Sequence, residues 1–141
     1  MVPLLLLLVL AVVDFGKAFN YYIDETHLAN EAARWAAVDK SPVSGQTISA
    51  AVKDQADTAE LKNGGATTSI VAPGVTITFC YTGTGNVGDA VTATTSATYH
   101  WLTFLTGGFG IPGLGDRTIT ATATMRLEHK YDGVAYTASA C

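Results

Sequence analysis

Residues 2–25 read VPLLLLLVLAVVDFGKAFNYYIDE. Its first twelve residues, 2–13, are all apolar, and Asp14 follows them directly. Crossing the hydrocarbon core of a bilayer takes about 20 residues at helical rise, so the apolar run alone is too short. The run also lacks the basic flank and the small-residue cleavage site of a secretory signal. The residues that follow this apolar run must therefore be read together with it.

One long helix up to about residue 39 explains the pattern. Phe15, Phe19 and Tyr22 open a series spaced by four and three residues, which is helical periodicity. Pro3 suits a first helical turn, where its missing N–H costs nothing. The predicted helix has roughly 35 residues and is about 50 Å long. We expect this series, with the alanines that follow it, to face a globular head. Its further members are Thr26, Ala29, Ala33 and Ala36.

The apolar first half of this helix needs an apolar environment on all sides. Lipid or packed neighbouring helices would supply one, so a membrane or filament-core helix is predicted. Its residues are Pro3, Leu4, Leu5, Leu6, Leu7, Leu8, Val9, Leu10, Val12, Val13, Phe15 and Phe19.

The charges on the helix are expected to be paired. Asp14 and Lys17 lie three residues apart, as do Glu31 and Arg34, so each pair can form within the helix. An unpaired charge in lipid or in a helix bundle is costly, and a neighbouring subunit could also supply the partner. Alternatively, Asp14 simply marks the membrane surface.

Composition limits the remaining choices. The chain has 141 residues, which suits one head (40–141) carrying one arm (1–39). Its net charge is −4 and its 8 Lys and Arg residues are scattered, which argues against nucleic-acid binding. Charged residues make up 14% of the chain, against about 25% in ordinary soluble domains. Apolar surface must therefore be hidden in lipid or in a neighbour.

The head is predicted to combine a second helix with an antiparallel sheet, an α+β arrangement. A break at 40–45 precedes helical periodicity over about 47–62, and Gly64 follows as a stop signal. Alternation at period two then predicts one apolar and one threonine-rich sheet face. The expected strands cover about 67–72, 75–82, 90–105 and 117–130, with a short tail strand ending near 139.

Two further features concern the ends of these strands. Cys80 and Cys141 fit no zinc spacing, so a disulfide is favoured, worth roughly 2 to 4 kcal/mol, although two free thiols are an alternative. The glycine-rich segment 106–116 contains Phe109, Ile111, Pro112 and Leu114. Apolar side chains on such a loop suggest contact with another subunit, and the alternative is local packing over the end of the sheet.

No catalytic, cofactor or metal site is predicted, so the chain is not expected to be an enzyme. Residues 83–88 fit G-x-G-x-x-G, but a strand follows where dinucleotide binding needs a helix N-terminus, so a hairpin turn is favoured. His27, His100 and His129 have no ligand spacing. The serines have no nucleophile-elbow context.

Both ends of the chain resemble a known family. Residues 14–20 (DFGKAFN), residues 29–38 (ANEAARWAAV) and the threonine-rich strands 91–101 and 118–126 are similar to TadE-like proteins, which are pilin-like components of the tight-adherence (Tad, type IVc) pilus. The matching pieces cover some 70 residues. The family normally opens with a basic leader, a cleaved glycine and a glutamate. None of these lies here, so we expect them upstream of Met1 and assign no cleavage residue.

The resemblance implies a structural role. It implies a pilus subunit, major or minor, that is held in the cytoplasmic membrane by its helix and then packs against copies of itself or related pilin-like proteins at the cell surface. Secretion and assembly machinery would be further partners, without nucleic acid. The alternative is a membrane-anchored adhesin or binding module that does not polymerise.

Overall fold

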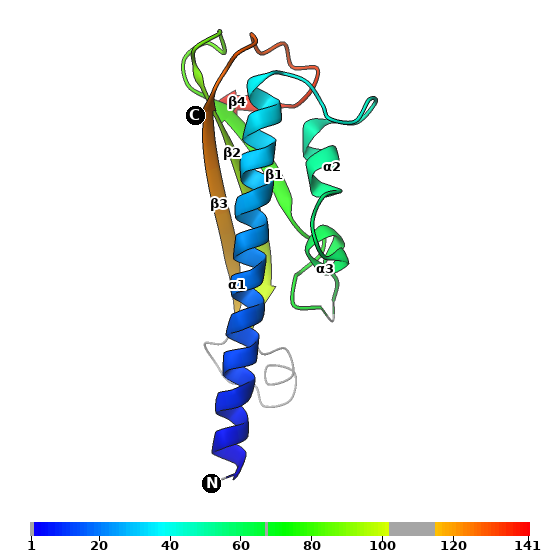
Figure 1. Cartoon of the computed structure of the whole chain (residues 1–141), viewed down its shortest axis with the longest axis vertical. Helices are drawn as coiled ribbons and strands as arrows, with labels where there is room; N and C mark the ends of the chain where they lie inside the picture. The colour runs from blue at the N-terminus through cyan, green and yellow to red at the C-terminus, as the bar shows by residue number, and fades with distance from the viewer. Residues whose placement is uncertain (1, 67, 102–114) are drawn as a thin grey trace.

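The computed structural model describes residues 2–66, 68–101 and 115–141, and it is dominated by one helix. Helix α1 covers Val2–Ala37, and it runs from the free N-terminal end of the molecule along the whole head (Figure 1). It ends where Asp39 takes a positive φ of 51° and its N–H bonds to Ala36 O at 3.1 Å. The predicted long helix is confirmed.

Two short helices replace the single second helix that the sequence predicts. Helix α2 covers Ile48–Lys53 and α3 covers Ala59–Asn63. Each begins at a threonine, Thr47 or Thr58, whose side-chain oxygen accepts a backbone N–H of the first turn. A turn separates the two helices, and Thr58 caps the second helix separately. The predicted continuous helix over 47–62 is therefore wrong.

The end of α3 confirms the stop at Gly64. This residue has φ 60°, and its N–H bonds to Glu60 O at 2.8 Å. A Cβ at this position would lie 2.3 Å from Val71 O, so only glycine fits.

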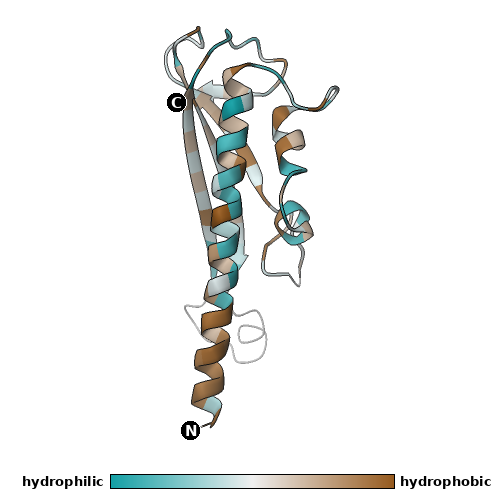
Figure 2. Ribbon diagram, in the orientation of Figure 1, coloured by the Kyte–Doolittle hydropathy of each residue, from teal (hydrophilic) through white to brown (hydrophobic). Residues whose placement is uncertain are grey.

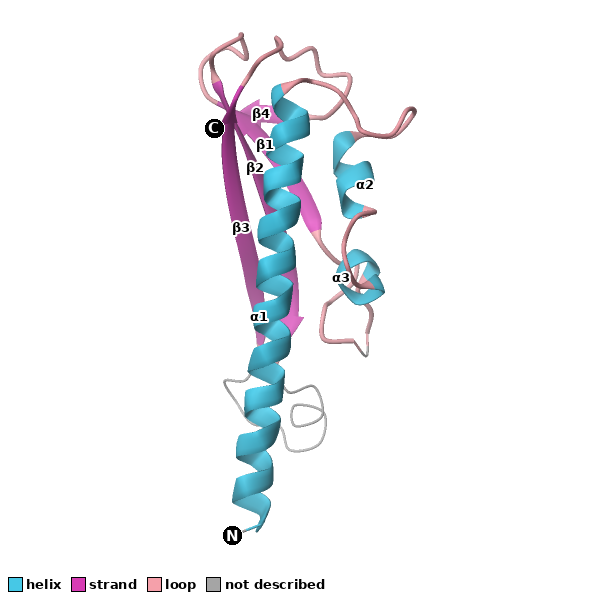
Figure 3. Cartoon of the chain, in the orientation of Figure 1, coloured by secondary structure: helices cyan, strands magenta, loops and turns pink. Residues whose placement is uncertain are grey.

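The sheet has four strands in the order β3-β2-β1-β4 (Figure 3). The strands β1 Thr76–Tyr81, β2 Ala90–His100 and β3 Asp116–Arg126 pair antiparallel, as predicted. Strand β4, Ala138–Ala140, pairs parallel with β1, so the sheet is mixed rather than purely antiparallel. The chain after β3 crosses the upper end of the head before it adds β4 beside β1 (Figure 1). Within the described part of 67–72, the expected strand is reduced to one bridge between Ile70 and Tyr99.

The two faces of the sheet differ as the alternation predicts. Along β2, every second side chain from Val91 to Tyr99 is buried, whereas the positions between them, Thr92, Thr94, Ser96 and Thr98, lie on the other face. Thr95 is an exception, because it lies on the buried face. Its hydroxyl donates to the backbone carbonyl of Glu25 in α1 at 3.1 Å. Helix α1 therefore packs on the apolar face of β2 and β3.

The series that the sequence places on the sheet side of α1 is buried only in part. Phe15, Phe19 and Tyr22 are 64%, 56% and 48% exposed, so these aromatic residues are not buried against the sheet. The contact is made instead by small side chains that let the helix backbone approach the sheet closely, and the alanines expected there are indeed buried. The buried residues of α1 are Ala18, Tyr21, Asp24, Glu25, Leu28, Ala29, Ala32, Ala33, Ala36 and Ala37.

Candidate functional site

The candidate site is the N-terminal part of α1 together with its junction to the head. We call residues 2–13 the arm. Its side chains are largely open to solvent, for example Leu4 at 72%, Leu6 at 59% and Val13 at 65%. Figure 2 shows the hydrophobic colour of α1 on the lower turns that extend beyond the sheet. The helix that begins with the arm is long and apolar enough to cross a membrane.

Exposure of this kind is unfavourable in water. Burying one Leu or Val side chain stabilises by about 1.5 to 3 kcal/mol, so shielding the whole arm outweighs any single contact in the head. The arm therefore needs lipid or protein around it, as the sequence predicts for Pro3 through Val13.

Immediately beyond the arm, polar side chains fasten α1 to the head. The phenol of Tyr99 in β2 donates to Asp14, with its oxygen 2.7 Å from Oδ1 and 3.2 Å from the backbone carbonyl oxygen. Burial, reinforced by this hydrogen bond, raises the pKa of Tyr99. The first charge after the apolar run is thus engaged by the sheet.

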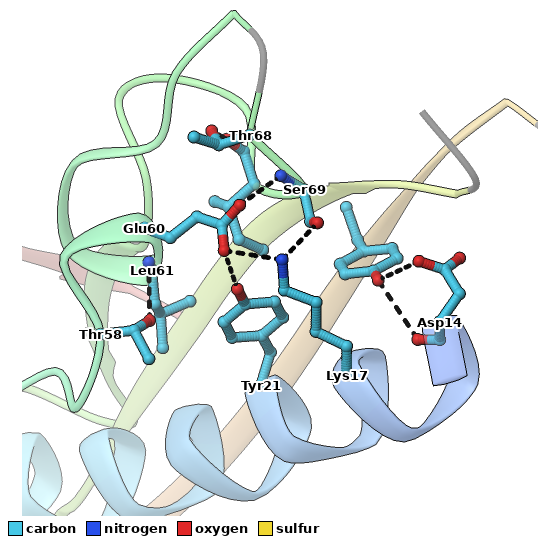
Figure 4. A network of polar contacts seen from close by, with 10 residues as sticks. Asp14, Lys17, Tyr21, Thr58, Glu60, Leu61, Thr68 and Ser69 are labelled. Atoms are coloured by element: carbon cyan, nitrogen blue, oxygen red, sulfur yellow. Dashed lines mark hydrogen bonds and ion pairs between the residues drawn. The ribbon is translucent and has the colours of Figure 1, made fainter. Parts of the chain in front are cut away.

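Lys17 joins a second network one turn later (Figure 4). Its Nζ lies 3.0 Å from Glu60 Oε2 in α3 and donates to Ser69 Oγ at 2.8 Å. The carboxylate of Glu60 also accepts the Tyr21 phenol and the Ser69 N–H. Burial alone would raise the pKa of Glu60, but the hydrogen bonds from Tyr21, Lys17 and Ser69 outweigh it and lower that pKa. We call Asp14, Lys17, Tyr21, Glu60, Ser69 and Tyr99 the junction.

The junction changes the expected charge pairing. Lys17 pairs with Glu60, which is 43 positions away in the sequence. Asp14 lies only three residues from Lys17, on the same face of α1. Glu31 and Arg34 do pair within α1, at 3.7 Å. No pattern in the sequence relates Lys17 to Glu60, since the contact exists only because α3 folds back beside α1.

Aromatic rings gather at the same level of the molecule. Trp101, which follows β2, stacks on Phe15 with ring centroids 6.4 Å apart and meets Tyr99 edge-on at 5.1 Å. Tyr99 also contacts Tyr21 at 5.8 Å. The base of the head thus carries aromatic and polar groups together.

Higher along α1, the head encloses two carboxyl groups whose burial the sequence does not predict. Asp24 accepts the backbone N–H of Asp57 at 3.0 Å. Glu25 is fully buried against the sheet, and neither of its carboxyl oxygens has a hydrogen-bond partner among the described residues. Burial raises the pKa of Glu25 to about 8. This group lies in the half of α1 that packs on the head, beyond the exposed arm.

The other predicted features have these outcomes. Cys80 and Cys141 form a disulfide, as favoured. The 83–88 segment is a turn, in which Asp89 Oδ2 accepts the N–H groups of Thr84 and Asn86 at 3.0 Å. His100 contacts Asp116 across β2 and β3. The loop residues Phe109, Ile111, Pro112 and Leu114 lie outside the described residues.

Comparison with known proteins finds a family match at the N-terminal end of the chain. Residues 1–34 match the TadE-like protein family, and this segment contains the arm and the α1 residues of the junction. No curated protein and no solved structure matches the chain. The match agrees with the resemblance found in the sequence: residues 1–34 are similar to TadE-like proteins.

Proposed function

We propose that the chain is a structural, non-catalytic subunit of a Tad-type pilus, assembled by packing of its arm against other helices. The observation that carries this proposal is the exposed apolar arm, continuous with a helix that is firmly held by the head. A rigid connection of this kind transmits the position of the arm to the head, which a flexible anchor would not do.

Assembly would proceed from the cytoplasmic membrane. Lipid first surrounds the arm, and arms of other copies or of related pilin-like proteins then replace the lipid, with help from secretion and assembly machinery. Because lipid tails are as apolar as leucine, this exchange depends on close helix packing rather than on further hydrophobic gain. The heads would then be displayed at the cell surface.

The experiment compares exposed apolar residues on the arm with exposed apolar residues on the head. The arm variant is Leu6→Ser with Leu8→Ser, at positions 59% and 58% exposed. The matched control is Val87→Ser with Val134→Ser, at head positions 65% and 80% exposed. Each is produced in cells with the Tad machinery, and sheared surface material is imaged and probed for the chain.

The wild-type chain and the control are expected in sheared fibres, and the arm variant is expected to be missing from them. Recovery of the wild-type chain only from membranes would contradict the proposal and favour an anchored adhesin or binding module. Fibres that contain the arm variant at the wild-type level would show that the arm is not the assembly surface.

A further inference from the structure

We propose that the base of the head rests in the interfacial layer of the bilayer, through a belt formed by Phe15, Phe19, Tyr22 and Trp101. This proposal rests on the membrane-held stage of the proposed function and specifies how deep the chain sits. The partner is the headgroup and upper acyl region of the lipid, not a second protein.

The order of residues along α1 places the belt at the end of the arm. Every residue of the arm is apolar, and charged residues begin at Asp14. The aromatic members of the belt on α1 run from Phe15 to Tyr22, a rise of about 10 Å. The polar layer on each side of a bilayer is roughly 5 to 8 Å thick, so the belt and this layer have comparable depth. A boundary at this level leaves the whole arm in hydrocarbon.

Two separate parts of the chain contribute to the belt. Trp101 directly follows β2, yet its ring stacks on Phe15 of α1. Phe15 is 64% exposed and Trp101 is partly exposed, so the pair presents aromatic surface at the base of the head. Aromatic residues with a polar atom, such as Trp and Tyr, prefer the boundary between lipid and water because one end is apolar and the other hydrated.

The charged side chains at the same level are held by the head. The Nζ of Lys17 contacts Glu60 and Ser69, and Asp14 accepts the phenol of Tyr99 (Figure 4). Both charges are thus directed to polar groups of the head, while the side chains of Phe15, Phe19 and Tyr22 remain exposed. The interfacial region of a bilayer accommodates aromatic side chains together with polar groups that already have hydrogen-bond partners.

Lipid explains the exposure better than one helical neighbour at this stage. A single packed helix would cover one stripe of the arm, whereas Leu4, Leu5, Leu6, Leu7 and Leu8 are consecutive and all between 49% and 72% exposed. Five successive positions point in all directions around a helix, so an environment that surrounds it is required.

The test uses the two tryptophans of the chain, Trp35 and Trp101. Trp35→Phe leaves only Trp101, and Trp101→Phe leaves only Trp35 as a matched control. The full-length chain is reconstituted in phosphatidylcholine vesicles that carry bromine atoms near the top, the middle or the end of the acyl chain. Quenching of tryptophan fluorescence is compared among the three lipids, and circular dichroism verifies that each variant is folded.

Trp101 is expected to be quenched most by bromine near the top of the acyl chain, by about twofold or more. Trp35 lies 20 positions beyond Phe15, about 30 Å along the helix, and is expected to show no quenching. Equal quenching of Trp35 and Trp101, or strongest quenching of Trp101 by the deepest bromine, would overturn the proposed boundary.

A third variant separates this proposal from the proposed function. Leu8→Trp, in a chain with both native tryptophans changed to Phe, reports on the arm and is expected to be quenched by deep bromine. Deep quenching of Leu8→Trp without any quenching of Trp101 would overturn the belt and leave the membrane-held stage intact. Absence of quenching in both would overturn the belt and the membrane-held stage together.

Discussion

At the scale of single residues, Glu25 has the least favourable surroundings of the carboxyl groups on α1. It is fully buried between α1 and the sheet, and the pKa of its side chain rises from the ordinary 4.5 to about 8. Burial disfavours the ionised form, so the folded chain holds this group protonated at neutral pH.

The stability of the fold should therefore depend on pH through Glu25. Because the folded-state pKa is raised, the contribution of Glu25 to stability is fully present below pH 4.5 and is lost as pH rises toward 8. The expected loss between pH 5 and pH 8 is on the order of 3 kcal/mol. Glu25→Gln should remove this part of the slope. Denaturant unfolding of the chain in detergent micelles at several pH values measures it.

The control for this prediction is Glu31→Gln. Glu31 is on the same helix but only partly buried, and it pairs with Arg34. Its variant should keep the wild-type slope between pH 5 and 8. An unchanged slope in Glu25→Gln would show that Glu25 is not the group responsible.

Glu60 is the second informative residue, because one carboxylate accepts three donors. Glu60→Ala would leave Lys17, Tyr21 and the Ser69 N–H without this acceptor. The free energy of unfolding should fall by about 1 to 2 kcal/mol. This value lies toward the low end of the range for hydrogen bonds to charged groups, because Lys17 is partly exposed. Thermal unfolding followed by circular dichroism measures the change.

Asp54→Ala is the matched control for Glu60. Asp54 pairs with Lys62 at 2.6 Å, and this pair lies on the surface. Its removal should leave the melting temperature nearly unchanged, since exposed ion pairs contribute little. Equal effects of the two substitutions would contradict a special role for the junction.

At the scale of elements, α1 combines two surfaces with different requirements. Its head-packed half is buried through alanines at 0% exposure, such as Ala32 and Ala36, whereas Phe15, Phe19 and Tyr22 in its first half are exposed. The sequence predicts one series from Phe15 to Ala36 on the sheet side, and only the alanines of that series are buried. Small side chains allow the helix backbone to approach the sheet closely, as in the contact of Thr95 with Glu25.

Substitution of one alanine should test this close approach. Ala32→Leu places a larger side chain between α1 and the sheet and should destabilise the fold by about 1 to 3 kcal/mol. Asn20→Leu, on the exposed side, should have little effect. Chemical denaturation in micelles compares the two variants. A neutral Ala32→Leu would mean that α1 does not pack tightly there.

At the scale of the whole molecule, the two ends of the chain are held differently. The N-terminal arm projects from the base of the head, whereas the C-terminus lies at the far end (Figure 1). There Cys141 is bonded to Cys80, and its N–H bonds to Tyr81 O at 3.0 Å. The disulfide closes a segment with a sequence separation of 61, which contains β2 and β3.

Removal of this disulfide should weaken the whole head. Cys80→Ser with Cys141→Ser should lower the free energy of unfolding by about 2 to 4 kcal/mol, because the unfolded chain gains freedom. Reduction of the wild-type chain should give a similar loss, measured by denaturant unfolding with and without reductant. The double variant treated with reductant is the control, because reductant should leave its free energy of unfolding unchanged. No change on reducing the wild-type chain would contradict the disulfide.

Local periodicity is enough to predict the regular elements of this chain. The apolar run and the absence of helix breakers predict α1, and the alternation of threonine with apolar residues predicts the two faces of β2 and β3. Residues 1–34 also carry the TadE-like pattern. Three features follow only from the folded structure: the exposure of Phe15, Phe19 and Tyr22, the pairing of Lys17 with Glu60, and the parallel pairing of β4 with β1. These features depend on contacts between segments that are distant in the sequence. Packing and burial select such contacts, and they produce no periodic pattern in the sequence.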